Sequence, residues 1–130
     1  MKFMLMMNAP RGNGDYAVMK WPPHDLKAHV DFMHELNREL AETGERVSAE
    51  GLDIPGNARI VRAGKDGTPE VTDGPFPESK EFLAGYWIVD VESPERAYAI
   101  AAQASTAPGP GGAPMNMAIE VREVMSAPPV

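Results

Sequence analysis

The stretch Val71–Glu81, which reads VTDGPFPESKE, is the centre of the fold prediction. Gly74 and Pro75 stand side by side and end a strand, because glycine has no Cβ and proline has no backbone N–H to donate. Asp73 is therefore predicted to lie at a strand end, beside a rigid turn. Functional side chains concentrate at such positions, so Asp73 is the first candidate for a catalytic residue.

Upstream of this stretch, the sequence predicts a β-hairpin. Segments 58–63 and 69–72 flank Gly64-Lys65-Asp66-Gly67, whose Asp-Gly pair is typical of a tight hairpin turn. We expect this hairpin to deliver Asp73 to the edge of the sheet.

Four further strands and two helices are predicted around the hairpin. Segments 3–7 and 83–91 are apolar on both faces, which is typical of central strands covered on both sides, and 46–52 and 117–122 alternate. A helix is expected from Pro23 to Thr43, ended by Gly44, and a second one begins at Ser93-Pro94. The order is βαββαβ with an inserted hairpin, a single α+β domain over residues 1–130.

Two helices cover only one face of a four-stranded sheet. The other face of this sheet therefore needs another cover, and a second copy of the chain is the simplest candidate. Long loops folding over the sheet are the alternative. Flexible segments are expected near residues 9–22, 104–116 and 126–130, which are rich in Gly, Pro and Ala or lie at the chain end.

The run Asp73-Gly-Pro-Phe followed by Glu78-x-Lys80-Glu81 resembles the signature of the DGPF family, within the YCII-related proteins. Three further family landmarks follow the same order: Glu50-Gly51-Leu52, Gly85-Tyr86 and Glu120-Val121-Arg122. The resemblance covers roughly residues 44 to 125. It implies a ferredoxin-like unit that pairs into a dimeric α/β barrel, and it implies no settled reaction. Related DGPF proteins are often encoded beside extracytoplasmic-function sigma factors, which suggests a regulatory setting.

Composition excludes several classes of partner. The net charge is −7 and Lys and Arg form no cluster, which argues against direct binding of nucleic acid or an anionic membrane. The apolar run at Met1–Met7 is too short for a signal peptide, and no stretch reaches the roughly 18 residues of a membrane span. We expect a soluble, cytoplasmic protein.

A formal dinucleotide-binding pattern is present at Gly12–Ala17, directly after the first predicted strand. It lacks the required context, because Trp21-Pro22-Pro23 interrupts the chain before a helix begins. A loop is the better interpretation, and no cofactor is predicted. Metal binding is not predicted either, since the chain has no cysteine and its three histidines are spaced five residues apart.

Asp73 and His29 are the candidate catalytic residues. A carboxylate in a partly apolar cavity suits a general acid or base, although an aspartate before Gly-Pro also caps its own turn. His29 falls within the apolar stripe of the first helix, beside Leu26 and Val30, and an imidazole there can transfer protons. The alternative is a histidine that flanks the core with one hydrogen bond.

Glu50, Arg62, Arg122 and Lys80 are the candidate substrate-binding residues. The two arginines could hold an anionic substrate through forked hydrogen bonds, or they could simply neutralise Glu50. For Lys80, a surface ion pair with Glu78 or Glu81 is the favoured alternative, because exposed pairs of this kind are common and weak.

Two functional hypotheses follow. The first is a small-molecule enzyme or binding protein that uses Asp73 as acid or base. The second is a non-catalytic regulatory or interaction module, linked to sigma-factor-associated transcription, in which the signature stabilises the turn and a homodimer.

Overall fold

The structure is a computed structural model of the chain and describes residues 1–10, 20–74 and 80–126. Its main sheet has four strands in the order β2-β5-β1-β6, and every pairing is antiparallel. The strands are β1 (Lys2–Pro10), β2 (Arg46–Gly51), β5 (Glu81–Asp90) and β6 (Ile119–Glu123). With two helices, this is a mixed α+β fold compatible with the expected ferredoxin-like plan.

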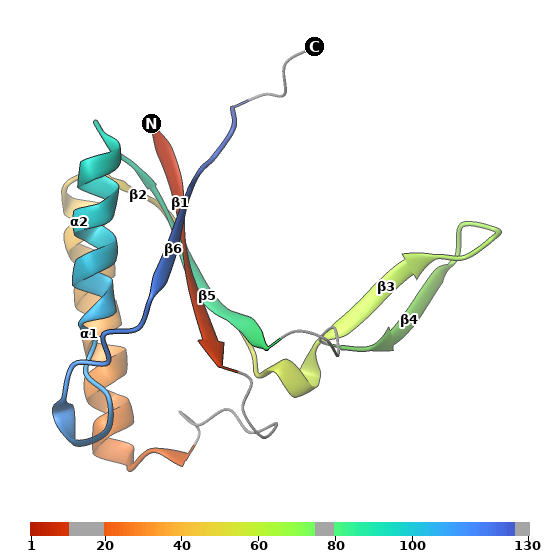
Figure 1. Cartoon of the computed structure of the whole chain (residues 1–130), viewed down its shortest axis with the longest axis horizontal. Helices are drawn as coiled ribbons and strands as arrows, with labels where there is room; N and C mark the ends of the chain where they lie inside the picture. Colours follow the sequence, from red (N-terminus) through yellow and green to blue (C-terminus); the bar gives the residue numbers. More distant parts are fainter. Residues whose placement is uncertain (11–19, 75–79, 127–130) are drawn as a thin grey trace.

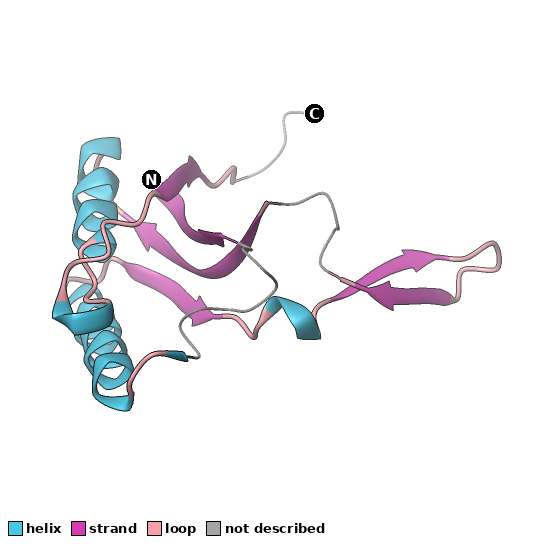
Figure 2. Ribbon diagram, turned by 60° about the horizontal axis from the view of Figure 1, so that its bottom comes forward, coloured by secondary structure: helices cyan, strands magenta, loops and turns pink. Residues whose placement is uncertain are grey.

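Helices α1 (Pro23–Glu42) and α2 (Pro94–Ser105) lie side by side on one face of this sheet (Figures 1 and 2). The core fills the space between the two layers. Its largest fully buried side chains are Leu5, Leu36, Val89 and Ile100. Full burial of such a side chain stabilises the fold by about 1.5–3 kcal/mol, so this layer contact is the main source of stability.

The local signals for the helix ends are confirmed. Gly44 adopts a φ of 77°, where glycine carries no Cβ penalty, and its N–H donates to the carbonyl of Ala41 at 3.1 Å. The hydroxyl oxygen of Ser93 accepts a hydrogen bond from the backbone N–H of Arg96 at 3.3 Å. Each helix therefore ends or begins where its capping residue stands.

The apolar stripe of α1 differs from the prediction at one position. Val30 is 39% exposed, whereas Leu36 and Leu40 are buried and Met33 packs against the core. At ~100° per residue, Val30 is turned by roughly 120° from Leu36, so it cannot face the sheet together with it. The placement of Val30 in the buried stripe was wrong.

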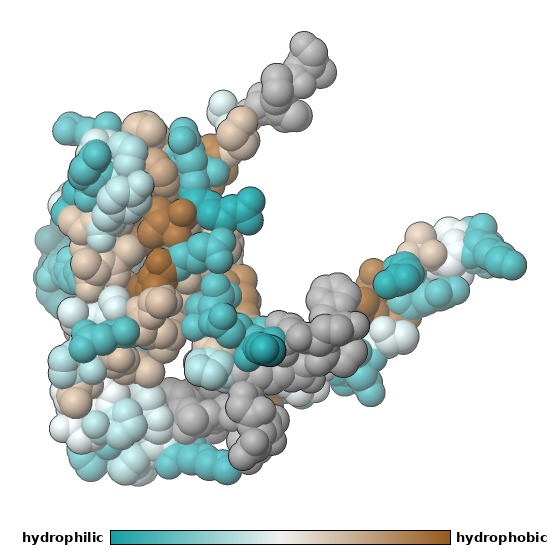
Figure 3. Space-filling model, viewed as in Figure 1, coloured by the Kyte–Doolittle hydropathy of each residue, from teal (hydrophilic) through white to brown (hydrophobic). Residues whose placement is uncertain are grey.

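Strands β3 (Arg59–Ala63) and β4 (Pro69–Asp73) form a separate antiparallel two-stranded sheet between β2 and β5 in the chain. This hairpin projects away from the body of the molecule, and hydrophobic atoms are visible along it in Figure 3. Val61 and Val71 face each other across the pair and are 61% and 58% exposed. The strand β4 ends at Asp73, as predicted.

The sheet face opposite the helices is lined by the alternate strand positions. Met4, Met6, Tyr86 and Ile88 lie there half-buried, because their chain neighbours point into the helix-side core. No described helix covers this face (Figure 1).

Three sequence expectations concern residues outside the described ranges. The glycine pattern begins at residue 12 and falls within 11–19, and positions 75–79 of the signature fall in the second gap. The expected flexible segments near 9–22 and 126–130 overlap the gaps, and they stay predictions.

Candidate functional site

A cavity of about 230 Å³ lies between α1 and the sheet, where β2 pairs with β5. Helix α1 contributes His29, Met33 and Asn37, which follow one another at intervals of four residues. Residues four apart lie on the same side of a helix, so the three side chains form one stripe above the sheet.

Four of the lining residues on the strand side are small and leave room beneath α1, namely Ala49, Gly51, Ala84 and Gly85. A Cβ added at Gly85 would stand 2.9 Å from the carbonyl oxygen of Glu50, closer than real Cβ contacts allow. Glycine is therefore required at position 85 for the two strands to approach.

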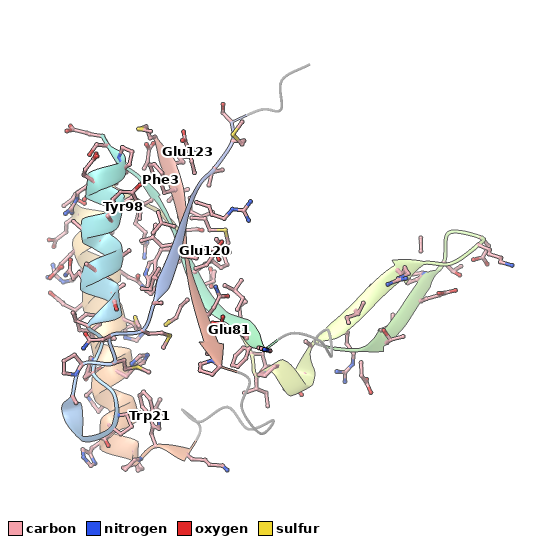
Figure 4. All side chains as sticks on the ribbon, viewed as in Figure 1. Phe3, Trp21, Glu81, Tyr98, Glu120 and Glu123 are labelled. Carbon is pink, nitrogen blue, oxygen red and sulfur yellow. The ribbon has the colours of Figure 1, made fainter. Side chains whose placement is uncertain are left out.

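His29 is held in the cavity wall by a distant part of the chain. Its Nδ1 lies 3.0 Å from the carbonyl oxygen of Pro108. A carbonyl oxygen can only accept, so Nδ1 carries the proton and Nε2 of the neutral ring is left as an acceptor. The ring of Trp21, which Figure 4 shows beside the start of α1, meets the imidazole edge-on with the centroids 5.4 Å apart.

The segment that supplies the Pro108 carbonyl is itself fastened to α1. Asp25, in the first turn of the helix, is only 6% exposed, and its Oδ2 accepts a hydrogen bond of 3.2 Å from the backbone N–H of Gly111. Within the segment, the N–H of Gly109 donates to the carbonyl of Ala113 at 2.7 Å. These contacts fix the position of the carbonyl that orients His29. The flexibility expected for residues 104–116 stays a prediction.

Asn37 is oriented by Trp87. The indole Nε1 donates a hydrogen bond of 2.9 Å to Oδ1 of Asn37. Because an indole N–H only donates, it must face the amide oxygen, and the amide orientation follows from that contact. The Nδ2 group of Asn37 makes no hydrogen bond to any other described residue. The cavity therefore offers a hydrogen-bond donor at Asn37 and an acceptor at His29.

Two of the sequence-predicted site residues, His29 and Glu50, are among the lining residues, but Glu50 is paired with Tyr86, so its side chain lies on the sheet face opposite His29. Glu50 belongs to β2 and its side chain is exposed. Asn37 was missed by sequence reasoning, although its spacing of eight residues from His29 on the same helix was a usable signal.

Asp73 lies elsewhere. Its side chain is 96% exposed on the projecting hairpin, and its Oδ1 stands 3.7 Å from Nε of Arg59. An exposed ion pair of this length contributes little. Of the other candidates, Arg62 is on the same hairpin, Arg122 is on β6 and Lys80 precedes β5. All three are exposed, and none lines the cavity.

The chemistry of the cavity is that of a mainly apolar site with few polar groups. No lysine or arginine is among its described lining residues. Nowhere in residues 1–10, 20–74 and 80–126 do three His, Asp or Glu side chains gather as a metal ion would need. Among the described helices, none combines the length and the apolar character required to cross a bilayer.

A search of curated proteins gave no significant match. A family model, in contrast, covers nearly the whole sequence: residues 1–124 match the YCII-related domain. The match includes α1, the four-stranded sheet and the cavity between them. The chain therefore belongs to the YCII-related domain family.

Proposed function

We propose that this protein binds a small organic molecule in the cavity beneath α1 and that His29 transfers a proton to or from it. The observation that carries this proposal is the contact between Nδ1 of His29 and the carbonyl of Pro108. This contact leaves Nε2 as the basic atom of a positioned imidazole in a pocket wall. A positioned histidine with an orienting partner is a common arrangement for general acid and base catalysis.

Asp73 has a place in this proposal only through a second copy of the chain. The sequence Asp73-Gly-Pro-Phe supports membership of the DGPF group, and we propose that the group's signature aspartate acts as a second acid or base. The Asp73 carboxylate is on a hairpin that projects from the body of the molecule (Figure 1), and Asp73 does not line the cavity of its own chain. A partner's hairpin would have to bring it to the site.

A homodimer is the second part of the proposal. The sheet face opposite the helices carries the half-buried side chains of Met4, Met6, Tyr86 and Ile88. Packing two such faces together would bury apolar surface at about 25 cal/mol per Å² and form a dimeric α/β barrel, with each hairpin as an insertion in the ferredoxin-like unit. The uncovered face supports this assembly.

The proposed site is tested by two-dimensional NMR of the backbone amides with a library of small, uncharged fragments. We expect binding fragments to shift the signals of Asn37, Ala49, Gly51 and Gly85 together. The variant His29→Asn keeps a donor toward Pro108 and removes Nε2, so it should remove the acceleration of proton exchange that the wild-type protein gives a bound ligand with an acidic proton. His34→Asn, an exposed histidine on the same helix, is the matched control. A library with no fragment that shifts the cavity signals would refute the site.

The second candidate function is a non-catalytic interaction module. The observation in its favour is the hairpin, whose Val61 and Val71 are exposed although an isolated two-stranded sheet is only marginally stable in water. A regulatory partner that pairs with the hairpin would cover the exposed valines and stabilise the two-stranded sheet. Val61→Lys should then remove binding of that partner while leaving fragment binding in the cavity unchanged.

A further inference from the structure

We infer that the cavity selects an elongated, uncharged molecule with a carbonyl-type acceptor at one end and a hydroxyl at the other. The acceptor end would meet Asn37 and the hydroxyl end would meet His29. The inference rests on the proposed function of the cavity and names the class of ligand that it takes.

The requirement for an acceptor comes from Asn37. Its Oδ1 is engaged by the indole N–H of Trp87, so the group left for a ligand is the donor Nδ2. A ligand placed there without an acceptor would leave this amide N–H partly shielded from water and without a partner, which costs binding free energy. A carbonyl oxygen satisfies the group without adding charge.

The requirement for a hydroxyl comes from His29. Because Nδ1 donates to the carbonyl of Pro108, the neutral ring presents an acceptor at Nε2. A hydroxyl group, for example that of a phenol, donates to this atom and can give up its proton to it. A second acceptor at this end would face the lone pair of Nε2 and be disfavoured.

The distance between the two groups sets the length of the ligand. His29 and Asn37 are eight residues apart on α1, which is about 12 Å along the helix axis at ~1.5 Å per residue. One small functional group cannot touch both. With about 3 Å for a hydrogen bond at each end, a molecule that bridges them needs roughly 6 Å or more between its acceptor and its hydroxyl.

The walls between the two ends determine the nature of that central portion. Met33 lies between His29 and Asn37 on α1, and Met7 and Trp87 also line the cavity, so the lining offers thioether and aromatic surface. No described lysine or arginine lines the cavity to neutralise a carboxylate or phosphate, so burying an anion there would cost its desolvation without a compensating charge. The central portion is therefore predicted to be apolar, and the whole ligand uncharged.

The probe for this inference is 4-(4-hydroxyphenyl)butan-2-one, which carries a ketone and a phenol at opposite ends of an apolar body. Two matched analogues remove one group each: 4-butylphenol lacks the ketone and 4-phenylbutan-2-one lacks the hydroxyl. Binding is measured by NMR titration of the amide signals of Asn37, Gly51 and Gly85. We expect each analogue to bind about 3- to 10-fold more weakly than the complete probe, the effect of one neutral hydrogen bond.

Two variants assign each group of the probe to its residue. Asn37→Asp keeps the oxygen that accepts from Trp87 and removes the Nδ2 donor, so the preference for the ketone should disappear. His29→Asn should remove the preference for the hydroxyl. Asn116→Asp and His34→Asn make the same chemical changes at exposed positions outside the cavity, and both preferences should survive in them.

The outcomes separate this inference from the proposed function. Preferences that vanish in the matching variant and persist in the controls support the inference. Equal binding of all three probes at the cavity, or preferences unaffected by both variants, would overturn it while the site itself stands. If the three probes fail to bind but other fragments shift the cavity signals, the ligand class is wrong and the site is right. If no fragment binds there, both are wrong.

Discussion

Glu45, which follows α1, accepts two hydrogen bonds from the guanidinium group of Arg96 in α2, each 2.8 Å long. The two residues are 51 positions apart in the sequence. The carboxylate is largely shielded, with its side chain 16% exposed, and it also accepts from the hydroxyl of Thr43 at 2.8 Å. This contact ties the end of α1 to the start of α2.

The first prediction concerns the contribution of the contact between Glu45 and Arg96 to stability. Replacing Arg96 by Met should lower the free energy of unfolding by about 0.5–1 kcal/mol, because the pair is bidentate but only partly shielded from water. Urea unfolding followed by circular dichroism measures the loss. Arg38→Met, on the exposed face of α1, removes a guanidinium that pairs only within its own helix and should cost less. An equal loss in both variants would contradict the role of Arg96 between the helices.

The second prediction is a pH dependence of the same contact. The hydrogen bonds from Arg96 lower the pKa of Glu45 below its ordinary value of 4.5, and the Thr43 hydroxyl adds to the effect. A carboxyl group with a lowered pKa in the folded state adds stability above its ordinary pKa, and this stability is lost as the pH falls through the folded-state value. The stability difference between wild type and Arg96→Met should therefore be full at pH 7 and shrink below pH 4.5. A difference that stays constant down to pH 3 would argue against this linkage.

The third prediction tests the close approach of β2 and β5. Gly85→Ala places a Cβ 2.9 Å from the Glu50 carbonyl oxygen and should destabilise the fold by about 1–3 kcal/mol, the usual cost of overpacking. Gly51→Ala is the matched control, since Gly51 is paired with Gly85 and nothing lies within 4 Å of its added Cβ. Urea unfolding of the two variants compares them directly. Equal stability would mean that the strands separate at little cost.

The fourth prediction separates the two roles of Asn37. Trp87 is 4% exposed, and Asn37→Leu would leave its indole N–H buried without an acceptor. We expect a loss of about 1–3 kcal/mol for this unsatisfied donor. Asn37→Asp keeps the acceptor and should lower the free energy of unfolding by less. If Asn37→Leu proved the less destabilising of the two changes, the hydrogen bond would be refuted. Unfolding followed by tryptophan fluorescence gives both values.

The fifth prediction concerns self-association. Ile88 lies half-buried on the sheet face opposite the helices, and a lysine there would introduce a charge into the proposed dimer interface. Ile88→Lys should turn the dimer into a monomer in light scattering, with its circular dichroism spectrum unchanged. Val61→Lys, on the hairpin, should leave a sheet-to-sheet dimer intact. If the wild-type protein were monomeric at micromolar concentration, the proposed homodimer would be contradicted.

The local elements were predictable because their signals are local. Gly44 ends α1, Ser93 caps α2, and Gly67 supplies the positive φ of 83° in the hairpin turn. Asp73 was likewise expected at a strand end and lies at one. Each of these depends on a few neighbouring residues, whose backbone preferences act in the same way in any fold.

The sequence alone determined the order of the strands and helices, their caps and the family landmarks. Only the tertiary structure decided that His29 meets Pro108, that Asn37 meets Trp87, and that Asp73 stands apart from both. These contacts join residues 79 and 50 positions apart, so no local pattern encodes them. They depend on how α1, the sheet and the segment around Pro108 pack together. That packing is decided by all the buried side chains of the core together.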